Sequence, residues 1–203
     1  MPLKVPLKVA VLASGRGSNL EALLEGAGEA YGVELVVSDR REARALAVAA
    51  GAGVRAVFAD PKAHRGLADY NAALARLLEG EGIELVALAG YMRLVREELL
   101  RSFAGRIMNI HPSLLPAFPG ADAQAQALVH GVKVSGCTVH FVDEGVDTGP
   151  IIGQRAVPVL EGDNAETLSA RILEEEHVLY PRMVTLYALG KIVTIGRRVE
   201  VRT

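Results

Sequence analysis

Short apolar runs alternate with segments of helical periodicity along the first half of the chain. Five runs are rich in Val, Leu or Ile and are expected to be buried strands, at 8–13, 33–37, 53–58, 83–89 and 106–110. Helices are expected from Ser18 onward and at 41–50 and 66–79. Because strands that alternate with helices form right-handed βαβ units, this half of the chain predicts a parallel sheet.

The second half of the chain carries a different pattern. After a short helix expected at 121–129, residues 132–142 alternate in character, and an acidic loop connects them directly to a further strand at 151–159. So short a connection predicts an antiparallel pair appended to the parallel sheet. A terminal hairpin is expected at 191–201, turning near Gly196.

A long helix is expected after Asp163, which forms a capping-box pattern with Glu166. Pro181 denies a hydrogen bond to the carbonyl group of His177, so this helix should kink or be interrupted near Glu176 and His177. No internal repeat or linker divides the sequence. The pattern predicts one α/β domain over residues 1–203, with a Rossmann-like, mostly parallel central sheet, helices on both faces and an antiparallel C-terminal extension.

A glycine-rich loop, SGRGSN, follows the first expected strand and leads into a helix. Ser18 and Glu21 form a capping-box pattern at its start. The unpaired N–H groups of a helix N-terminus suit a phosphate, but the glycines of this loop equally fit a tight turn with no ligand. The spacing departs from both GxGxxG and GxxxxGK, which disfavours an ordinary NAD or ATP site.

Two polar residues stand at the end of the fifth expected strand, in RIMNIHPSLLPAFPG. Asn109 and His111 are two positions apart, so their side chains project to the same side of an extended segment. Pro112 ends the strand, since proline cannot continue a ladder of hydrogen bonds. Ligands of open α/β sheets bind at the carboxyl ends of strands. An amide and an imidazole there are suited to stabilising an oxyanion and moving protons in acyl transfer.

Composition narrows the classes of partner. The 203 residues carry a net charge of -2 and spread their Lys and Arg along the chain, so nucleic acid is not expected as a partner. The single cysteine excludes an internal disulfide, and the five histidines lack the i, i+4 spacing of a helical zinc site, so no metal is expected. No apolar run approaches the roughly 20 residues of a membrane helix, and no signal peptide is evident, so a cytoplasmic location is expected.

Three further groups have a structural reading beside a functional one. Met92, Arg93, Leu94 and Val95 could form an apolar and cationic wall for a flat heterocycle, although the residues alone favour a turn with Met92 packed in the core. Asp39 is best read as a helix cap or a solvated turn. The acidic loop DEGVDTG lacks the ligand order of an EF-hand and is usually a solvent-exposed turn.

Five segments together resemble a known family: SGRGSNLEAL, LAGYMRLV, NIHPSLLPAFPG, VHFVDEGVDTGPII and EEEHVLYP. In this order and over nearly the whole chain they are similar to the phosphoribosylglycinamide formyltransferases, folate-dependent enzymes of purine biosynthesis. The resemblance implies transfer of a formyl group from 10-formyltetrahydrofolate, a co-substrate, to the amine of glycinamide ribonucleotide, without a metal. It implies small-molecule substrates, no membrane, and a monomer or homodimer.

The resemblance also implies the role of each candidate residue. The N-terminal half would carry the phosphate and nucleotide-substrate loop, and the C-terminal half the folate and catalytic loops. Asn109, His111 and Asp147 would be catalytic. The substrate would be bound at Gly15, with its phosphate held by Gly17, Ser18 and Asn19 and its ribose hydroxyls by Glu176. The folate would be surrounded by Met92, Arg93, Leu94, Val95, Val142, Asp143, Glu144, Gly145 and Val146, with Asp147 at the end of that loop.

One position departs from the family pattern, and three other functions are compatible with parts of the sequence. Asp122 stands where the family commonly has a histidine. A 10-formyltetrahydrofolate hydrolase would use the same three catalytic residues but carries an extra N-terminal domain. A methionyl-tRNA formyltransferase would have a basic C-terminal domain. A non-catalytic folate or nucleotide-binding module would have no need for Asn109, His111 and Asp147 together.

Overall fold

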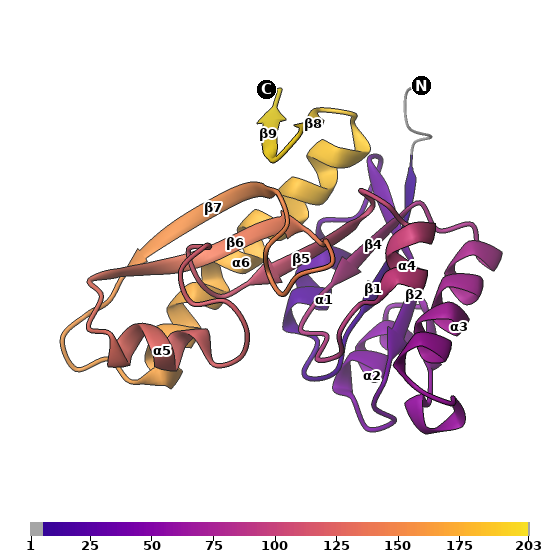
Figure 1. Ribbon diagram of the computed structural model, residues 1–203, viewed down its shortest axis with the longest axis horizontal. Helices are drawn as coiled ribbons and strands as arrows, with labels where there is room; N and C mark the ends of the chain where they lie inside the picture. The colour runs from indigo at the N-terminus through magenta and orange to yellow at the C-terminus, as the bar shows by residue number, and fades with distance from the viewer. Residues whose placement is uncertain (1–5, 203) are drawn as a thin grey trace.

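The computed structural model of the protein describes residues 6–202. Residues 1–5 and 203, which the prediction of a single domain included, lie outside the described residues. The rest forms a seven-stranded sheet in the order β3-β2-β1-β4-β5-β6-β7 and a separate two-stranded sheet, β8-β9 (Figure 1). The strands are β1 Leu7–Leu12, β2 Tyr31–Ser38, β3 Arg55–Phe58, β4 Leu85–Leu88, β5 Ile107–His111, β6 Val134–Phe141, β7 Ile151–Pro158, β8 Ile192–Ile195 and β9 Arg198–Val201.

The directions of the strands confirm the predicted fold class. The pairs β2–β3, β1–β2, β1–β4 and β4–β5 are parallel. β6 runs antiparallel to β5, and β7 runs antiparallel to β6, as the direct connection between these last two strands predicts. β8 and β9 form the terminal hairpin around Gly196. The sheet is therefore a parallel, Rossmann-like sheet extended by two antiparallel strands.

The helices follow the predicted order, with two additions. The helices are α1 Ser18–Glu25, α2 Arg44–Gly51, α3 Leu67–Gly80, α4 Glu97–Ser102, α5 Ala123–Val129 and α6 Ala165–Ala188, with a 3-10 helix, η1, at Pro61–Ala63. α4 and η1 were not expected from the sequence. Both are short, and α4 is not periodic over enough residues to stand out from the turn before it.

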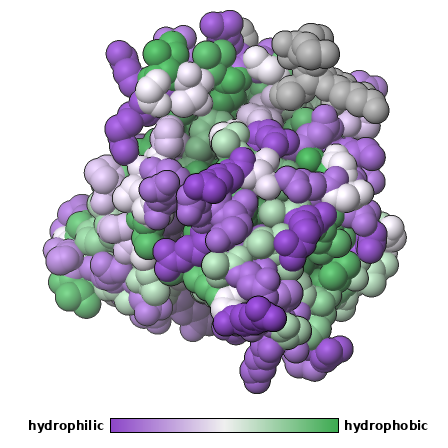
Figure 2. Space-filling view, turned by 45° about the vertical axis from the view of Figure 1, so that its right-hand side comes forward, coloured by the Kyte–Doolittle hydropathy of each residue, from purple (hydrophilic) through white to green (hydrophobic). Residues whose placement is uncertain are grey.

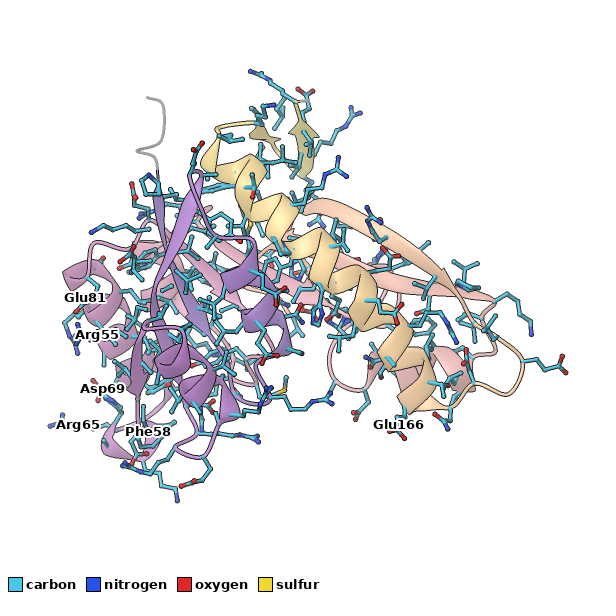
Figure 3. All side chains as sticks on the ribbon, turned by 180° about the vertical axis from the view of Figure 1, so that it is seen from behind. Arg55, Phe58, Arg65, Asp69, Glu81 and Glu166 are labelled. Carbon is cyan, nitrogen blue, oxygen red and sulfur yellow. The ribbon has the colours of Figure 1, made fainter. Side chains whose placement is uncertain are left out.

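The helices cover both faces of the sheet. On one face the core contains Leu20 and Leu23 of α1, Ala45 of α2, and Leu168 and Ile172 of α6. On the other face it contains Tyr70, Leu74 and Leu78 of α3, with Leu99 and Phe103 around α4. Figure 3 shows α6 running along the back of the sheet, opposite the side that α3 and α4 occupy in Figure 1. Because both faces are buried, the central parallel strands β1 and β4 are apolar along nearly their whole length.

The order of the strands creates a switch point between β1 and β4. The two strands are neighbours, but the chain leaves β1 toward β2 on one side and leaves β4 toward β5 on the other. Their outgoing loops separate, and ligands of doubly wound sheets bind in the crevice that this leaves at the carboxyl ends. Here the two loops remain joined by hydrogen bonds, among them one from Ser14 N to Gly90 O at 3.1 Å.

Both predicted capping boxes are wrong, although both helices begin within two residues of the expected positions. The N-cap of α1 is Gly17, and within residues 6–202 no side chain caps this helix. Glu21 instead pairs with Arg44 at 2.7 Å. The N-cap of α6 is Asn164, which forms a capping box with Thr167. Polar residues cluster at both starts, so the spacing alone did not identify which of them supplies the cap.

Of the kink or interruption predicted near Glu176 and His177, the interruption does not occur. The helix is continuous from Ala165 to Ala188 with Pro181 inside it. Its apolar side is anchored on both sides of the proline, by Leu179, Met183 and Val184 among the buried residues. Tertiary packing of this kind outweighs the local loss of one backbone hydrogen bond.

Some apolar residues also reach the surface. Figure 2 shows hydrophobic residues on one face in several separate places among hydrophilic ones. Such scattered exposure is ordinary for a folded domain. Within residues 6–202, no helix is both long and apolar enough to cross a membrane.

Gly17 is a position where only glycine fits, which gives a test of the loop before α1. Its φ is +83°, and a Cβ atom there would lie 2.9 Å from the Cα atom of Ala45 in α2. We expect Gly17→Ala to lower the free energy of unfolding by about 1 to 3 kcal/mol, because the left-handed conformation and the close backbone contact are both penalised. Urea denaturation measures this change.

Gly15→Ala is the matched control in the same loop. A Cβ atom at Gly15 would meet nothing within 4 Å. A loss of stability in the control as large as that in Gly17→Ala would contradict the assignment of the effect to Ala45 and to the backbone of Gly17.

Candidate active site

Asn109 and His111 lie at the carboxyl end of β5, as their spacing predicts. In the β5–β6 ladder Asn109 is opposite His140, and His111 is opposite Thr138. The strand ends at His111, immediately before Pro112. His111 is buried and Asn109 is half-buried. The antiparallel partner strand therefore brings a second histidine beside the amide.

Asp147 completes this group from the loop between β6 and β7. Its Oδ2 atom lies 3.3 Å from His111 Nδ1, and its Oδ1 atom accepts a hydrogen bond from Asn109 Nδ2 at 3.3 Å. Gly120 N donates to Oδ2 at 2.8 Å. The structure thus brings together the three residues for which the family resemblance implied a catalytic role.

His140 is a polar neighbour of this group that the sequence did not single out. Its Nε2 atom lies 3.2 Å from Asn109 Nδ2 and 3.5 Å from Asp147 Oδ1. Its Nδ1 atom lies 2.8 Å from the carbonyl oxygen of Phe141. Nε2 therefore faces two partners: it accepts from the Asn109 amide when it carries no proton, and it donates to the Asp147 carboxylate when it does. The signal available in the sequence was its place in a strand that could pair with β5.

The surroundings of Asp147 favour its charged form. Burial by itself raises the pKa of this carboxyl group, but the hydrogen bond from His140, the N–H group of Gly120 and the charges of the two histidines together hold the pKa below its ordinary value. Asp147 therefore remains a carboxylate at neutral pH.

His111 has an acceptor on each side. Nδ1 faces Asp147, and Nε2 lies 2.9 Å from the carbonyl oxygen of Phe118. Both ring nitrogens can donate at the same time only in the imidazolium form. Phe118 has a φ of +53° and its ring stacks on His130 with centroids 5.2 Å apart. The segment after β5 is thus folded back onto the imidazole.

Asp122, the position that departs from the family pattern, is exposed at the start of α5. It is the N-cap of that helix, with φ at +57°, and forms no side-chain capping bond among the described residues. Its backbone carbonyl accepts the first hydrogen bond of the helix, from Gln126 N. A carboxylate here lies in the same folded-back segment as Phe118 and Gly120.

The glycine loop and the long helix α6 meet at a second polar pair. Asn19 Nδ2 donates to Glu176 Oε2 at 2.7 Å, and both side chains are buried. Within the described residues, Asn19 Oδ1 has no hydrogen-bond partner. Since no side chain caps α1 among residues 6–202, the first N–H groups of that helix remain available to an anion.

The structure differs from the expectation for Met92. The side chain is 68% exposed, so it is not part of the core. Leu94 is 46% exposed and Val146, in the β6–β7 loop, is 51% exposed. Apolar side chains thus face solvent on both loops for which the resemblance implied folate contacts.

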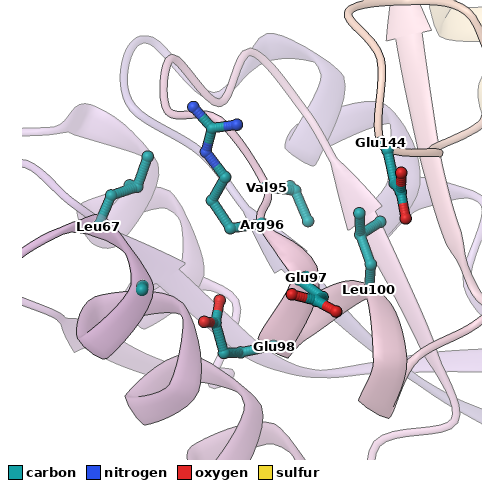
Figure 4. A pocket seen from close by; sticks show the side chains of 8 residues that line it. Leu67, Val95, Arg96, Glu97, Glu98, Leu100 and Glu144 are labelled. Atoms are coloured by element: carbon teal, nitrogen blue, oxygen red, sulfur yellow. The ribbon is translucent and has the colours of Figure 1, made fainter.

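A cavity of about 640 Å³ lies beside these loops (Figure 4). Of the residues expected around the folate, Val95 and Glu144 line it. The rest of its lining comes from Leu67, Ala68, Arg96, Glu97, Glu98 and Leu100. The cavity is open and mixed in character, with three carboxylates and one guanidinium around aliphatic side chains.

Comparisons with known proteins place this geometry in a family. The sequence profile of the formyl transferase family matches residues 7–184, which include every candidate site residue. The chain belongs to the formyl transferase family. Among solved structures, the chain is similar to glycinamide ribonucleotide transformylase 1 from Symbiobacterium toebii. The TM-score is 0.95 and the sequence identity is 55%, over 97% of this chain and 94% of that one.

Curated relatives have related names. The chain is 46% identical over 180 residues to phosphoribosylglycinamide formyltransferase of Bacillus subtilis (strain 168), covering 87% of this chain and 92% of that protein. It is 47% identical over 188 residues to the trifunctional purine biosynthetic protein adenosine-3 of Drosophila pseudoobscura pseudoobscura, covering 90% of this chain and 14% of that protein. The chain therefore spans one part of the longer relative and nearly all of the shorter one.

Two carboxyl groups of the candidate site, half-buried Asp147 and buried Glu176, have opposite electrostatic settings. Burial raises the pKa of Glu176 from 4.5 to about 7, while the hydrogen bond from Asn19 acts in the opposite direction. The carboxyl group of Glu176 therefore binds a proton more tightly in the folded chain than in the unfolded chain. The resulting stabilisation is complete below pH 4.5 and is lost as the pH rises to about 7.

We expect Glu176→Gln to remove this dependence. The free energy of unfolding of the wild type should fall, relative to that of the variant, by roughly 3 kcal/mol between pH 4.5 and 7, because one pKa unit corresponds to about 1.4 kcal/mol. Urea denaturation of both proteins at several pH values measures the difference. A difference that stays constant over this range would contradict the raised pKa.

Proposed function

We propose that this chain transfers the formyl group of 10-formyltetrahydrofolate to the amine of glycinamide ribonucleotide, a step of purine biosynthesis. The observation that carries the proposal is the meeting of Asn109, His111 and Asp147 within hydrogen-bonding reach at the end of β5. The names of the relatives, at 46% and 55% identity, support the choice of donor and acceptor. The proposal covers residues 1–203 as one formyltransferase domain that acts in the cytoplasm on small molecules, as a monomer or homodimer.

The glycine loop is the proposed site of the substrate phosphate. Gly15, Gly17, Ser18 and Asn19 surround the start of α1, where helix N–H groups and the helix dipole both favour an anion. The proposed ribose contact is Glu176, which Asn19 holds at 2.7 Å. The phosphate and ribose sites would thus share Asn19, and its free carbonyl oxygen adds an acceptor beside them.

The proposed folate site lies between the two exposed loops. One wall is Met92, Arg93, Leu94 and Val95, and the other is the loop that contains Val142, Asp143, Glu144, Gly145 and Val146. Exposed apolar side chains on both sides suit a flat heterocycle, and the carboxylates of the adjoining cavity suit its N–H groups. Asp147 ends the second wall, so the reactive end of the folate would lie beside the catalytic group.

In the proposed reaction the amine nitrogen attacks the formyl carbon, and the carbonyl oxygen becomes an oxyanion. Asn109 would donate to this oxygen. Its present bond to Asp147, at 3.3 Å, is longer than an ordinary N–H···O bond, so a shorter bond to the oxyanion can replace it. Protonated His111 would stabilise the same charge, exchanging the Phe118 carbonyl for the oxyanion if Nε2 is the donor.

The intermediate then collapses without a covalent bond to the protein. The proton of the attacking nitrogen moves to the folate nitrogen, the bond from that nitrogen to the formyl carbon breaks, and tetrahydrofolate leaves. Asp147 would assist by keeping the imidazolium of His111 in place and by accepting and returning a proton. The products are the formylated amine and tetrahydrofolate, so atoms and charge balance.

The release of tetrahydrofolate from 10-formyltetrahydrofolate tests the proposal directly. We expect release only when glycinamide ribonucleotide is present, because the acceptor supplies the nucleophile. Absorbance measures the product with and without the amine. Equal rates in both arms would indicate hydrolysis, and the absence of release in both would indicate a binding module. Either result would overturn the proposal.

Substitution of the amide tests the role of the catalytic group. We expect Asn109→Ala to lower turnover by about 10² to 10³, the usual loss for one oxyanion donor, and Asp147→Asn to lower turnover by removing the charge beside His111. Steady-state kinetics with both substrates measures this loss. Asn164→Ala, which removes an amide that caps α6 away from this group, is the control. Near wild-type turnover in folded Asn109→Ala would contradict the assigned role.

A further inference from the structure

Asp39 follows β2 and is more buried than its sequence context suggests. The sequence favoured a helix cap or a solvated turn, and the structure contradicts both. The side chain is 3% exposed. Oδ1 accepts a hydrogen bond from Ser14 Oγ at 2.5 Å, and Oδ2 accepts one from Arg93 Nε at 2.8 Å. The carboxylate thus joins the loop after β1 to the loop after β4 across the switch point of the sheet.

Ser14 extends this connection to the backbone. Its Oγ atom also accepts a hydrogen bond from Met92 N at 2.9 Å. Because a hydroxyl has a single proton and Ser14 gives it to Asp39, its lone pairs are directed at the N–H group of Met92. A chain of hydrogen bonds therefore runs from the backbone of Met92 through Ser14 to Asp39, and from there to Arg93.

Arg93 is the charged partner of this carboxylate. Its guanidinium carbon lies 5.8 Å from the centre of the Tyr70 ring, and the Tyr91 hydroxyl donates to the Tyr70 hydroxyl at 3.2 Å. Arg93 also lines a cavity of about 190 Å³ together with Pro61, Gly66, Leu67 and Tyr70. One edge of the guanidinium is thus fixed by Asp39, while the side chain remains 38% exposed.

Val95 packs against the core, but polar contacts hold the rest of this wall. Met92 and Leu94 are 68% and 46% exposed, so burial of their side chains contributes little to its position. At the far end of the segment, buried Asn71 accepts a hydrogen bond from Arg96 N at 3.0 Å and donates to the Leu94 carbonyl oxygen at 3.4 Å. Ser14 and Asp39 fix the near end.

We propose that Asp39 is a positioning residue for the folate site, acting through Ser14 on the backbone of Met92 and directly on the guanidinium of Arg93. This inference rests on the proposed function, since it takes the segment from Met92 to Val95 as a wall of the folate site. Ser14 is the first residue of the glycine loop, so the same hydrogen bonds place the folate wall relative to the start of the substrate loop.

The test separates folate binding from the other steps. We expect Asp39→Ala to raise the Michaelis constant for 10-formyltetrahydrofolate, and the dissociation constant of tetrahydrofolate measured by calorimetry, by about tenfold or more. The reason is that the substitution removes two hydrogen bonds and releases Arg93. A tenfold change in a dissociation constant corresponds to about 1.4 kcal/mol. The Michaelis constant for glycinamide ribonucleotide and kcat should change less than threefold, because Asp39 contacts neither the phosphate loop beyond Ser14 nor the catalytic group.

Two further variants keep the test informative if Asp39→Ala folds poorly. Ser14→Ala removes one hydroxyl and the tie to Met92, and should weaken tetrahydrofolate binding while leaving the ion pair intact. Asp39→Asn can still accept from Arg93 and donate to Ser14, so its folate affinity should lie between those of the wild type and Asp39→Ala. This graded recovery is not expected if Asp39 only stabilises the fold.

Asp163→Ala is the matched control. Its carboxylate is 5% exposed and bonds an arginine, Arg171, at 2.8 and 2.9 Å. It lies just before α6. In Figure 3, Glu166 in the first turn of α6 is on the opposite side of the molecule from Arg65 and Asp69, which flank the cavity residues Leu67 and Ala68 in the sequence. Asp163→Ala should reduce thermal stability without weakening tetrahydrofolate binding.

Each outcome decides between the two proposals. Wild-type affinity for tetrahydrofolate in both Asp39→Ala and Ser14→Ala would overturn the positioning role, as would an equal loss in Asp163→Ala or an equal rise in both Michaelis constants. Failure of amine-dependent turnover in the wild type would overturn the proposed function, and calorimetry would still compare the variants. A wild type that does not bind tetrahydrofolate would overturn both.

Discussion

The partly buried carboxylate of Asp147 is the interaction on which the candidate site depends. Removing a carboxylate from water is unfavourable unless hydrogen bonds and positive charge replace the solvent. Here the replacements come from three places: Asn109 and His111 at the end of β5, His140 on β6, and the backbone of Gly120 in the segment after β5. The requirements of one anion therefore fix a strand end, its antiparallel neighbour and two loops relative to one another.

The antiparallel extension of the sheet is what makes this possible. In a purely parallel sheet, a helical crossover would follow β5, and the strand beside β5 would run in the same direction as β5. Because β6 returns antiparallel, His140 lies opposite Asn109 in the ladder, and the β6–β7 turn carries Asp147 back to the same edge. The two added strands thus complete the polar group that begins on the last parallel strand.

The sequence predicted most of the fold because the apolar pattern is strong where both faces of the sheet are buried. Asn109 and His111 followed from their spacing before Pro112. Asp147 did not, since an acidic loop is usually exposed, and its role came from the family resemblance. His140 was missed because its neighbours depend on register, which a strand pattern leaves undetermined. Asp39 was misread because its partners, Ser14 and Arg93, come from other strand ends.

The acidic side chains of Asp147 and Glu176 show how one fold can hold carboxyl groups for different tasks. Asp147 has histidines and an N–H group around it, which lower its pKa, whereas Glu176 has mainly apolar surroundings and one amide, and its pKa is raised. A carboxylate that stays charged can hold an imidazolium through the proposed reaction. A carboxyl group that gains its proton near neutrality can instead both donate to and accept from hydroxyl groups, as a ribose contact requires. The opposite environments therefore agree with the division of the site into a catalytic end at β5 and a substrate end at α1 and α6.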